Sequence, residues 1–298
     1  MATLRELKGR IGSVASSEKI TGAMKMISSA KMHKAEGILR RLLPFRHCVQ
    51  TVIGSLLSSD AAVSSPLTAP RASVHSAAIV VLGSDDGLCG AYNVNIFKGL
   101  LGTIGSLRKE CGENIGIEII PVGKKMMRAV EKIAAADPHI TLAPFAGIDS
   151  KSDGDSVKEF SQALERRFLA GELDRVVLQY MHFVSAGKQR LVADTYLPIS
   201  QEALAGESEV KAEGRPYLFE PDAKTIFATV LPMYLLSVMQ EAFAENRASE
   251  QAARVMAMQS ANDNAQKLLE QLQLEYNKLR QQGITTELLD IVGGQARD

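Results

Sequence analysis

The sequence has few cysteines, no net charge and no long uninterrupted apolar run, and each shortage argues against a class of protein. Its three cysteines (Cys48, Cys89 and Cys111) follow no metal-binding or disulfide spacing, which is typical of a reducing compartment. Lys+Arg and Asp+Glu both number 34, which argues against a general binder of nucleic acid or anionic membranes. No uninterrupted apolar run reaches the roughly 18 residues that span a bilayer.

Both ends of the chain have the spacing of long helices. Leu4, Leu7, Ile11 and Val14 recur at helical intervals, and the pattern resumes at Ile20, Met24 and Ile27 and continues to about residue 57. It predicts an N-terminal helical segment over 1–58, which we expect to be folded structure and not a targeting signal. A similar pattern predicts a C-terminal helix over 222–298, kinked but not ended at Pro232.

The middle of the chain, 74–200, alternates between strand and helix patterns. Strands are expected at 77–83, 115–123, 140–147 and 174–185, helices at 93–111, 124–136 and 156–169, and an edge strand at 189–199. Such alternation predicts a Rossmann-like, mostly parallel sheet covered on both faces, hence the α/β class. Residues 58–76 and 200–221 are rich in turn-forming residues and are expected to be linkers.

The two end segments are too long to fold back into the sheet domain. At ~1.5 Å per residue they measure roughly 80 and 105 Å, against a radius of gyration near 15 Å for a domain of about 150 residues. The first 46 residues carry ten Lys/Arg and three Glu, whereas 241–298 carry nine Asp/Glu and six Lys/Arg. We therefore expect an antiparallel coiled coil in which the C-terminal helix extends ~20 Å beyond its partner.

That extension ends in an apolar stripe that nothing in this chain covers. Within "LRQQGITTELLDIVGG" (279–294), the stripe consists of Ile284, Leu288, Ile291 and Val292. The polar run "RQQ" (280–282) directly precedes it, and it is either a solvated face or a partner contact. An apolar stripe of this kind indicates a binding surface for another protein.

One glycine-rich turn, "VVLGSDDGLCGAYN" (80–93), is placed where a nucleotide-binding enzyme would hold phosphates. Its glycines, Gly83, Gly87 and Gly90, do not have the G-x-G-x-x-G spacing, and Asp85 and Asp86 would repel a pyrophosphate. We interpret the segment as a tight turn that packs strand against helix. Cys89 is either a reactive thiol or, as we favour, a small buried residue.

Five blocks in the correct order resemble the gamma-subunit family of F-type ATP synthases, the rotor shaft. They are "KITGAMKMISSAKMHKAE" (19–36), "SDDGLCGAYN" (84–93), "FVSAGKQRLVADTYLPI" (183–199), "SEQAARVMAMQSANDNA" (249–265) and "LQLEYNKLRQQGITTELLDIVGG" (272–294). The likeness covers the whole chain, densely at both ends and thinly from about 96 to 180. One departure is Asp86, where the family usually has Arg, so a charge contact there is not carried over.

The resemblance implies a non-catalytic subunit, present once per complex, without a cofactor or metal. Its helical pair would stand inside a ring of three alpha and three beta subunits, its sheet domain would rest with the epsilon subunit on the membrane c-ring, and nucleic acid would play no part. Ion flow would turn the shaft and so drive ATP synthesis or hydrolysis at the beta sites. The absence of an evident transit segment favours a bacterial chain on the cytoplasmic face of the inner membrane over the alternative of a processed organellar protein.

The resemblance also implies roles for individual residues. Arg280, Gln281 and Thr285 match positions that meet a catch loop of the beta subunit. Met24, with Lys25 beside it, matches the position that faces an acidic lever segment of the same subunit. The remaining matches, at the tip in an apolar sleeve of the ring, are Ile284, Leu288, Ile291 and Val292.

Two other functions are compatible with parts of the sequence. A dinucleotide-dependent oxidoreductase would account for the sheet domain but not for the two helices, and bound nucleotide on the isolated chain would favour it. A coiled-coil scaffold would account for the helices but not for the polar patch beside an apolar tip, and self-dimerisation would favour it. The rotor shaft is the interpretation that accounts for all of these features.

Overall fold

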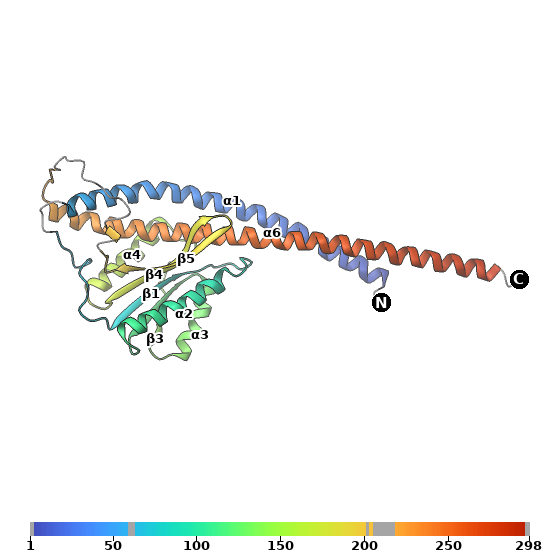
Figure 1. Cartoon of the computed structure of the whole chain (residues 1–298), viewed down its shortest axis with the longest axis horizontal. Coiled ribbons are helices and arrows are strands. Elements are labelled where there is room, and N and C mark those ends of the chain that lie inside the picture. Colours follow the sequence, from blue (N-terminus) through green and yellow to red (C-terminus); the bar gives the residue numbers. More distant parts are fainter. Residues whose placement is uncertain (1–2, 59–62, 201–202, 205–217, 296–298) are drawn as a thin grey trace. The chain divides into compact units, whose positions relative to one another are not determined.

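The fold is a pair of long helices and a five-stranded sheet, seen in a computed structural model that describes residues 3–58, 63–200, 203–204 and 218–295, with side chains to 289 (Figure 1). The helices are α1 (Leu4–Leu57), α2 (Tyr92–Cys111), α3 (Lys124–Ala136), α4 (Gly154–Leu169) and α6 (Ala223–Gln295). The strands are β1 (Ser76–Leu82), β2 (Gly116–Val122), β3 (Ile140–Leu142), β4 (Arg175–Ser185) and β5 (Lys188–Leu197). The expected α/β class, with N- and C-terminal helices packed together, is confirmed.

The sheet has the strand order β3-β2-β1-β4-β5. Its first four strands are parallel, and β5 pairs antiparallel with β4 at the edge, as expected. The third strand ends at Leu142 and is therefore shorter than the predicted 140–147. Pro144, two residues later, has no N–H to donate to a strand ladder. The expected segment therefore continues as a loop to Gly147, whose φ of 82° is left-handed.

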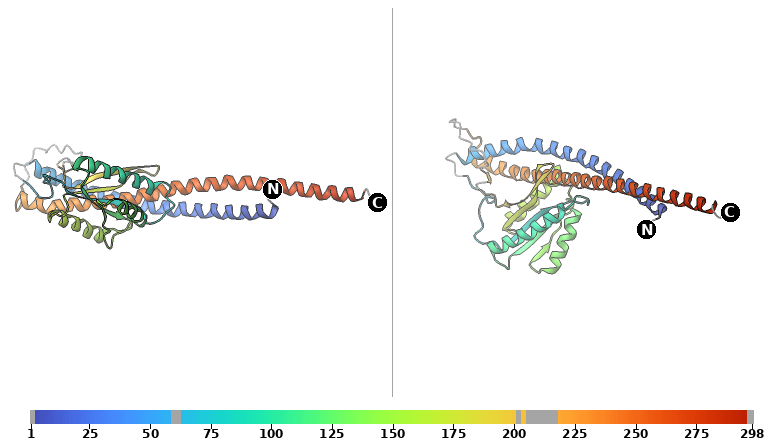
Figure 2. Two further views of the ribbon diagram at one scale, coloured as in Figure 1. Left: turned by 90° about the horizontal axis from the view of Figure 1, so that it is seen from below. Right: turned by 45° about the vertical axis from the view of Figure 1, so that its right-hand side comes forward.

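Alternating residues of the central strand face two separate apolar cores. Ala78, Val80 and Leu82 pack with α4 and with residues of α1 and α6, whereas Ala77, Ile79 and Val81 pack with α2 and α3. This arrangement follows from the period of two along a strand, and it covers both faces of the sheet (Figure 2).

The two long helices begin at side-chain caps that the sequence encodes. At the start of α1 the Thr3 hydroxyl accepts from the Glu6 N–H at 3.2 Å, and the Glu6 carboxylate accepts from the Thr3 N–H at 2.8 Å. At the start of α6 the Asp222 carboxylate accepts from the Thr225 N–H at 2.8 Å. Pro44 and Pro232 both lie inside continuous helices, so Pro232 does not end its helix, as predicted.

The chain divides by packing into two compact units, each described by itself. The helical unit comprises Met1–Ser29 and Arg254–Asp298, and the sheet unit comprises Ala30–Ala253. Each unit therefore contains part of α1 and part of α6. The division predicted from secondary structure, at 1–58, 74–200 and 222–298, stays a prediction.

One stretch of α6 resembles a membrane span by length and composition alone. Within the described part of α6, a window has a mean hydropathy of 1.4, so by length and composition it passes the test for a membrane span. Half of that window is buried inside the protein.

Candidate partner-binding surface

The last turns of α6 carry exposed apolar side chains in the helical unit. Ile284 is 49% exposed, Leu288 57% and Leu289 66%. In Figure 1 the C-terminal end of α6 extends past the N-terminal end of α1, within the same unit. This is the extension that the sequence predicts, and its first two predicted stripe residues are indeed uncovered by the described chain.

Two of the predicted stripe residues, Ile291 and Val292, lie in α6, but their side chains fall outside the described residues. Conversely, sequence analysis missed Leu289, the most exposed of the apolar residues in this turn. Residues chosen at helical intervals all lie on one face of the helix, whereas a helix without a neighbour exposes side chains on every face. The signal that could have found Leu289 is its position beyond the predicted end of the partner helix.

The predicted polar patch lies one to two turns before the apolar end. Arg280, Gln281 and Thr285 are all exposed on α6. Gln281 and Thr285 line a shallow depression together with Lys278, Gln282 and Thr286. The Thr285 hydroxyl donates to the Gln281 carbonyl at 2.9 Å, so its oxygen remains available to accept from a partner.

The other predicted contact residues, Met24 and Lys25, lie on α1 in the helical unit and are both half-buried. Their neighbour Met26 is 73% exposed. Ile20 and Ile27 are also more than half exposed. The spacing identified a helix correctly, but not which of its faces is covered.

The contact between the helices in this unit is partly polar. Asn262 on α6 donates to the Glu18 carbonyl of α1 at 2.8 Å. The neighbouring Gly22 faces this amide, and a Cβ there would lie at an ordinary van der Waals distance of 3.4 Å from Asn262 Nδ2.

The glycine turn of the sheet unit is filled by the protein's own groups. A Cβ on Gly83 would lie 2.9 Å from Met126 Cβ, so the glycine allows α3 to pack against the end of β1. The Asp85 carboxylate accepts from the Lys124 N–H at 2.9 Å and from the Ser150 hydroxyl at 2.7 Å. It therefore lies at the N-terminus of α3, where an anion would bind.

Electrostatics agree with this packing role. Burial by itself would raise the pKa of Asp85, but the hydrogen bonds from Lys124 and Ser150 lower it, so the carboxylate stays charged. Asp86 pairs with Lys151 at 3.5 Å, and Cys89 is buried, as expected. The geometry supports the tight-turn interpretation and gives the dinucleotide alternative no support.

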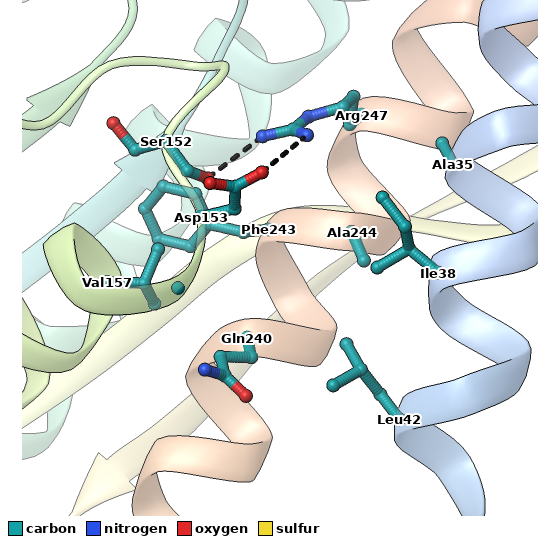
Figure 3. Close-up of a pocket in the computed structure, with 11 residues that line it drawn as sticks. Ala35, Ile38, Leu42, Ser152, Asp153, Val157, Gln240, Phe243, Ala244 and Arg247 are labelled. Carbon is teal, nitrogen blue, oxygen red and sulfur yellow. Dashed lines mark hydrogen bonds and ion pairs between the residues drawn. The ribbon is translucent and has the colours of Figure 1, made fainter.

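A recess of about 300 Å³ in the sheet unit lies between α1, α6 and the start of α4 (Figure 3). Its walls are mainly apolar, from Ile38, Leu42, Val157 and Phe243. At its rim the Arg247 guanidinium donates to the Ser152 carbonyl at 2.9 Å.

The sequence is similar to a known family along almost its whole length. A family model described as ATP synthase matches residues 3–296. The ATP synthase gamma chains of Bacteroides thetaiotaomicron and Bacteroides fragilis are 41% identical over 302 residues and 42% identical over 294 residues. That of Chromobacterium violaceum is 37% identical over 300 residues, and all three alignments cover 99% of both chains.

Solved structures share the fold. A chain of the Euglena gracilis mitochondrial ATP synthase (OSCP/F1/c-ring) matches with a TM-score of 0.65 and 21% identity, over 98% of this chain and 93% of that one. A chain of the Tetrahymena thermophila mitochondrial ATP synthase (central stalk and c-ring) matches with a TM-score of 0.53 over 81% of this chain. At this identity the likeness shows the fold alone.

Proposed function

The chain belongs to the ATP synthase gamma-chain family, and from this membership we propose that it is the central rotating shaft of an ATP synthase. It couples ion flow through a membrane ring to ATP synthesis or hydrolysis on neighbouring subunits. It does so by presenting different sides of an asymmetric helical pair to each catalytic site in turn. Each orientation contacts the sites differently, and that difference in contact free energy shifts their conformations.

The observation that carries the proposal is the exposed apolar end of α6. Ile284, Leu288 and Leu289 are about half to two-thirds exposed in the helical unit. A cluster of this kind at a chain end is unfavourable in water and indicates cover by another protein. An apolar sleeve makes few directional bonds with the tip and therefore permits it to turn.

The polar residues near that end have complementary roles in the proposal. Arg280, Gln281 and Thr285 contact a loop of the beta subunit, for which the exposed guanidinium and amide are suited as donors. Met24 and Lys25 face an acidic lever segment of the same subunit, where the lysine contributes opposite charge. Ile291 and Val292 continue the apolar tip.

The other partners follow from the same proposal. The ring around the shaft contains three alpha and three beta subunits, and the sheet unit contacts the epsilon subunit and the membrane c-ring. One copy serves each complex, on the cytoplasmic face of a bacterial inner membrane. The chain itself is non-catalytic: the beta subunits provide the chemistry.

The test is purification of the tagged chain from its native cells, with ATPase activity measured on the eluate. We expect two larger subunits in about threefold excess over the chain, a stoichiometry that follows from a ring around one shaft. Hydrolysis should accompany that assembly and be absent from the isolated chain. Recovery of the chain alone, with a bound nicotinamide nucleotide, would refute the proposal.

A further inference from the structure

The sheet unit has a crevice of the type in which Rossmann-like sheets bind ligands, and its occupant here is α6. From β1 the chain passes outward to β2 and β3 and then returns to β4 on the other side of β1. The direction of winding therefore reverses between β1 and β4. In open α/β sheets, the carboxyl ends of the strands at such a switch point form the usual ligand crevice.

One side chain of α6 bridges the two strands where they separate. Direct pairing of β1 with β4 ends at Val81 and Gln179, and the same register continued by two residues would pair Gly83 with Met181. In place of that pairing, Asn246 Nδ2 donates to the Gly83 carbonyl at 3.0 Å. Asn246 Oδ1 accepts from the Met181 N–H at 3.3 Å.

Further polar contacts surround this amide. The Tyr92 hydroxyl, at the start of α2, donates to Asn246 Oδ1 at 2.7 Å. One turn along α6, the Ser249 hydroxyl donates to the Met181 carbonyl at 2.9 Å. Glu245, the residue before Asn246, places its carboxylate Oε2 2.7 Å from His182 Nδ1 of β4. Asn246 is only 3% exposed, so all of its bonds are made away from water.

These bonds are directional, as are the bonds of Arg247 to the Ser152 carbonyl and of Tyr196 to the Leu235 carbonyl elsewhere along this part of α6. Apolar contacts, such as those of Met239 and Phe243 in the core that α6 forms with α4 and the sheet, allow a helix to slide or rotate, because the hydrophobic effect is non-directional. Hydrogen bonds weaken steeply away from their preferred geometry. The amide therefore fixes both the rotation and the axial position of α6 against β1 and β4.

We infer that Asn246 is a positioning residue that locks the helix into the switch-point crevice, so that the sheet unit and this part of α6 turn as one body. The inference rests on the proposed function, since a shaft transmits torque only if its joint with the driven domain does not slip. The crevice that holds a diffusible ligand in other sheets here holds a segment of the same chain. Without the amide, the Gly83 carbonyl and the Met181 N–H would be buried without a partner.

The test compares Asn246→Leu, which keeps a similar volume and removes the amide, with Ser237→Ala. Ser237 is equally buried on α6, but its hydroxyl donates to the Tyr234 carbonyl within the same helix. ATP hydrolysis and ATP-driven ion uptake are measured in the same membrane vesicles that contain the whole complex. We expect Asn246→Leu to lower uptake per ATP hydrolysed about twofold or more, since a buried partner is lost, and Ser237→Ala to leave the ratio unchanged.

A second variant covers the case in which Asn246→Leu does not assemble. Tyr92→Phe removes one hydroxyl and leaves the ring in place, so a smaller fall in the same ratio is expected. An unchanged ratio in an assembled Asn246→Leu complex, or in Tyr92→Phe if the former fails, would overturn the inference, as would equal losses of hydrolysis and uptake. If unmodified complex containing the chain shows no ATP-driven uptake, the proposed function itself fails.

Discussion

Replacing Leu288 with Asp tests whether the exposed end of α6 is covered by a partner. Leu288 is 57% exposed in the helical unit, and full burial of a leucine side chain is worth about 1.5–3 kcal/mol. Complete cover of the exposed part therefore contributes roughly 1–2 kcal/mol to assembly. The aspartate loses this contribution and places a charge with no partner in an apolar sleeve.

The charge adds the larger part of the effect. A polar group buried without a compensating bond costs about 1–3 kcal/mol, and a charge costs more. Together the two effects exceed roughly 3 kcal/mol, which corresponds to more than about 100-fold in the assembly equilibrium. In the isolated chain the same substitution stays at the surface, where changes are usually within about 0.5 kcal/mol.

The assay measures assembly and chain stability separately. The variant replaces the native copy, and the amount of intact complex is measured as membrane-bound ATPase and as subunits recovered with the tagged chain. Leu288→Met is the matched control, because it keeps an apolar side chain of similar volume. We expect complex to be nearly absent for Leu288→Asp and normal for Leu288→Met, with similar unfolding temperatures for both isolated chains.

A normal yield of complex with Leu288→Asp would refute the reasoning. It would show that this turn of α6 remains in water after assembly, and therefore that no partner covers its apolar side chains. A large loss of stability in the isolated variant would refute it differently, since Leu288 would then be part of the chain's own core.

Three further predictions concern coupling, packing and pH. Arg280→Ala should lower ATP-driven ion uptake but not the unfolding temperature, because the side chain is exposed; unchanged uptake, measured beside Arg280→Lys, would contradict its role as a donor. Phe160→Ala should cost about 3–5 kcal/mol in chemical denaturation, against little for the half-exposed Leu169→Ala, since Phe160 is fully buried and lies 5.0 Å from the Phe145 ring. Burial raises the pKa of Glu165, and the hydrogen bond from Ser161 offsets this only in part. As the pH rises above 4.5, Glu165 therefore loses its proton more readily in the unfolded chain than in the folded one, and the free energy of unfolding falls. Glu165→Gln should remove that fall, and parallel pH–stability curves for the two proteins would exclude it.

The sequence predicted the elements well wherever a local pattern determines them. The N-terminal ends of α1 and α6 are set by Thr3 and Asp222, whose side chains accept hydrogen bonds from backbone N–H groups three residues later. The alternation of strands and helices determined the parallel sheet in the same way. The exception was β3, where the predicted strand ran through Pro144, whose missing N–H was visible in the sequence.

The candidate site was predicted less completely, because exposure depends on the partner helix. The residues of the C-terminal stripe were identified as far as Ile284 and Leu288, yet Ile20 and Ile27, which belong to the apolar pattern that predicted α1, are more than half exposed. Helical spacing gives the angle between side chains but not the direction of the neighbouring helix. The contacts between the helices include polar ones, such as Asn262 with the Glu18 carbonyl, which hydropathy does not detect.

The polar stretch of α6 from Glu241 to Gln251 shows most clearly where local patterns fail. Glu245, Asn246, Ser249 and Glu250 are all buried, although their composition is typical of a solvated helix face. Asn246 bonds to Tyr92 and Gly83, which are 154 and 163 residues away in the chain, so no window of sequence contains the pairing. Buried polar groups cost free energy unless they are fully partnered, and apolar side chains would fill the same space more cheaply. What they add is a directional restraint on the orientation of α6 on the sheet, which the proposed rotating shaft requires and simple burial does not provide.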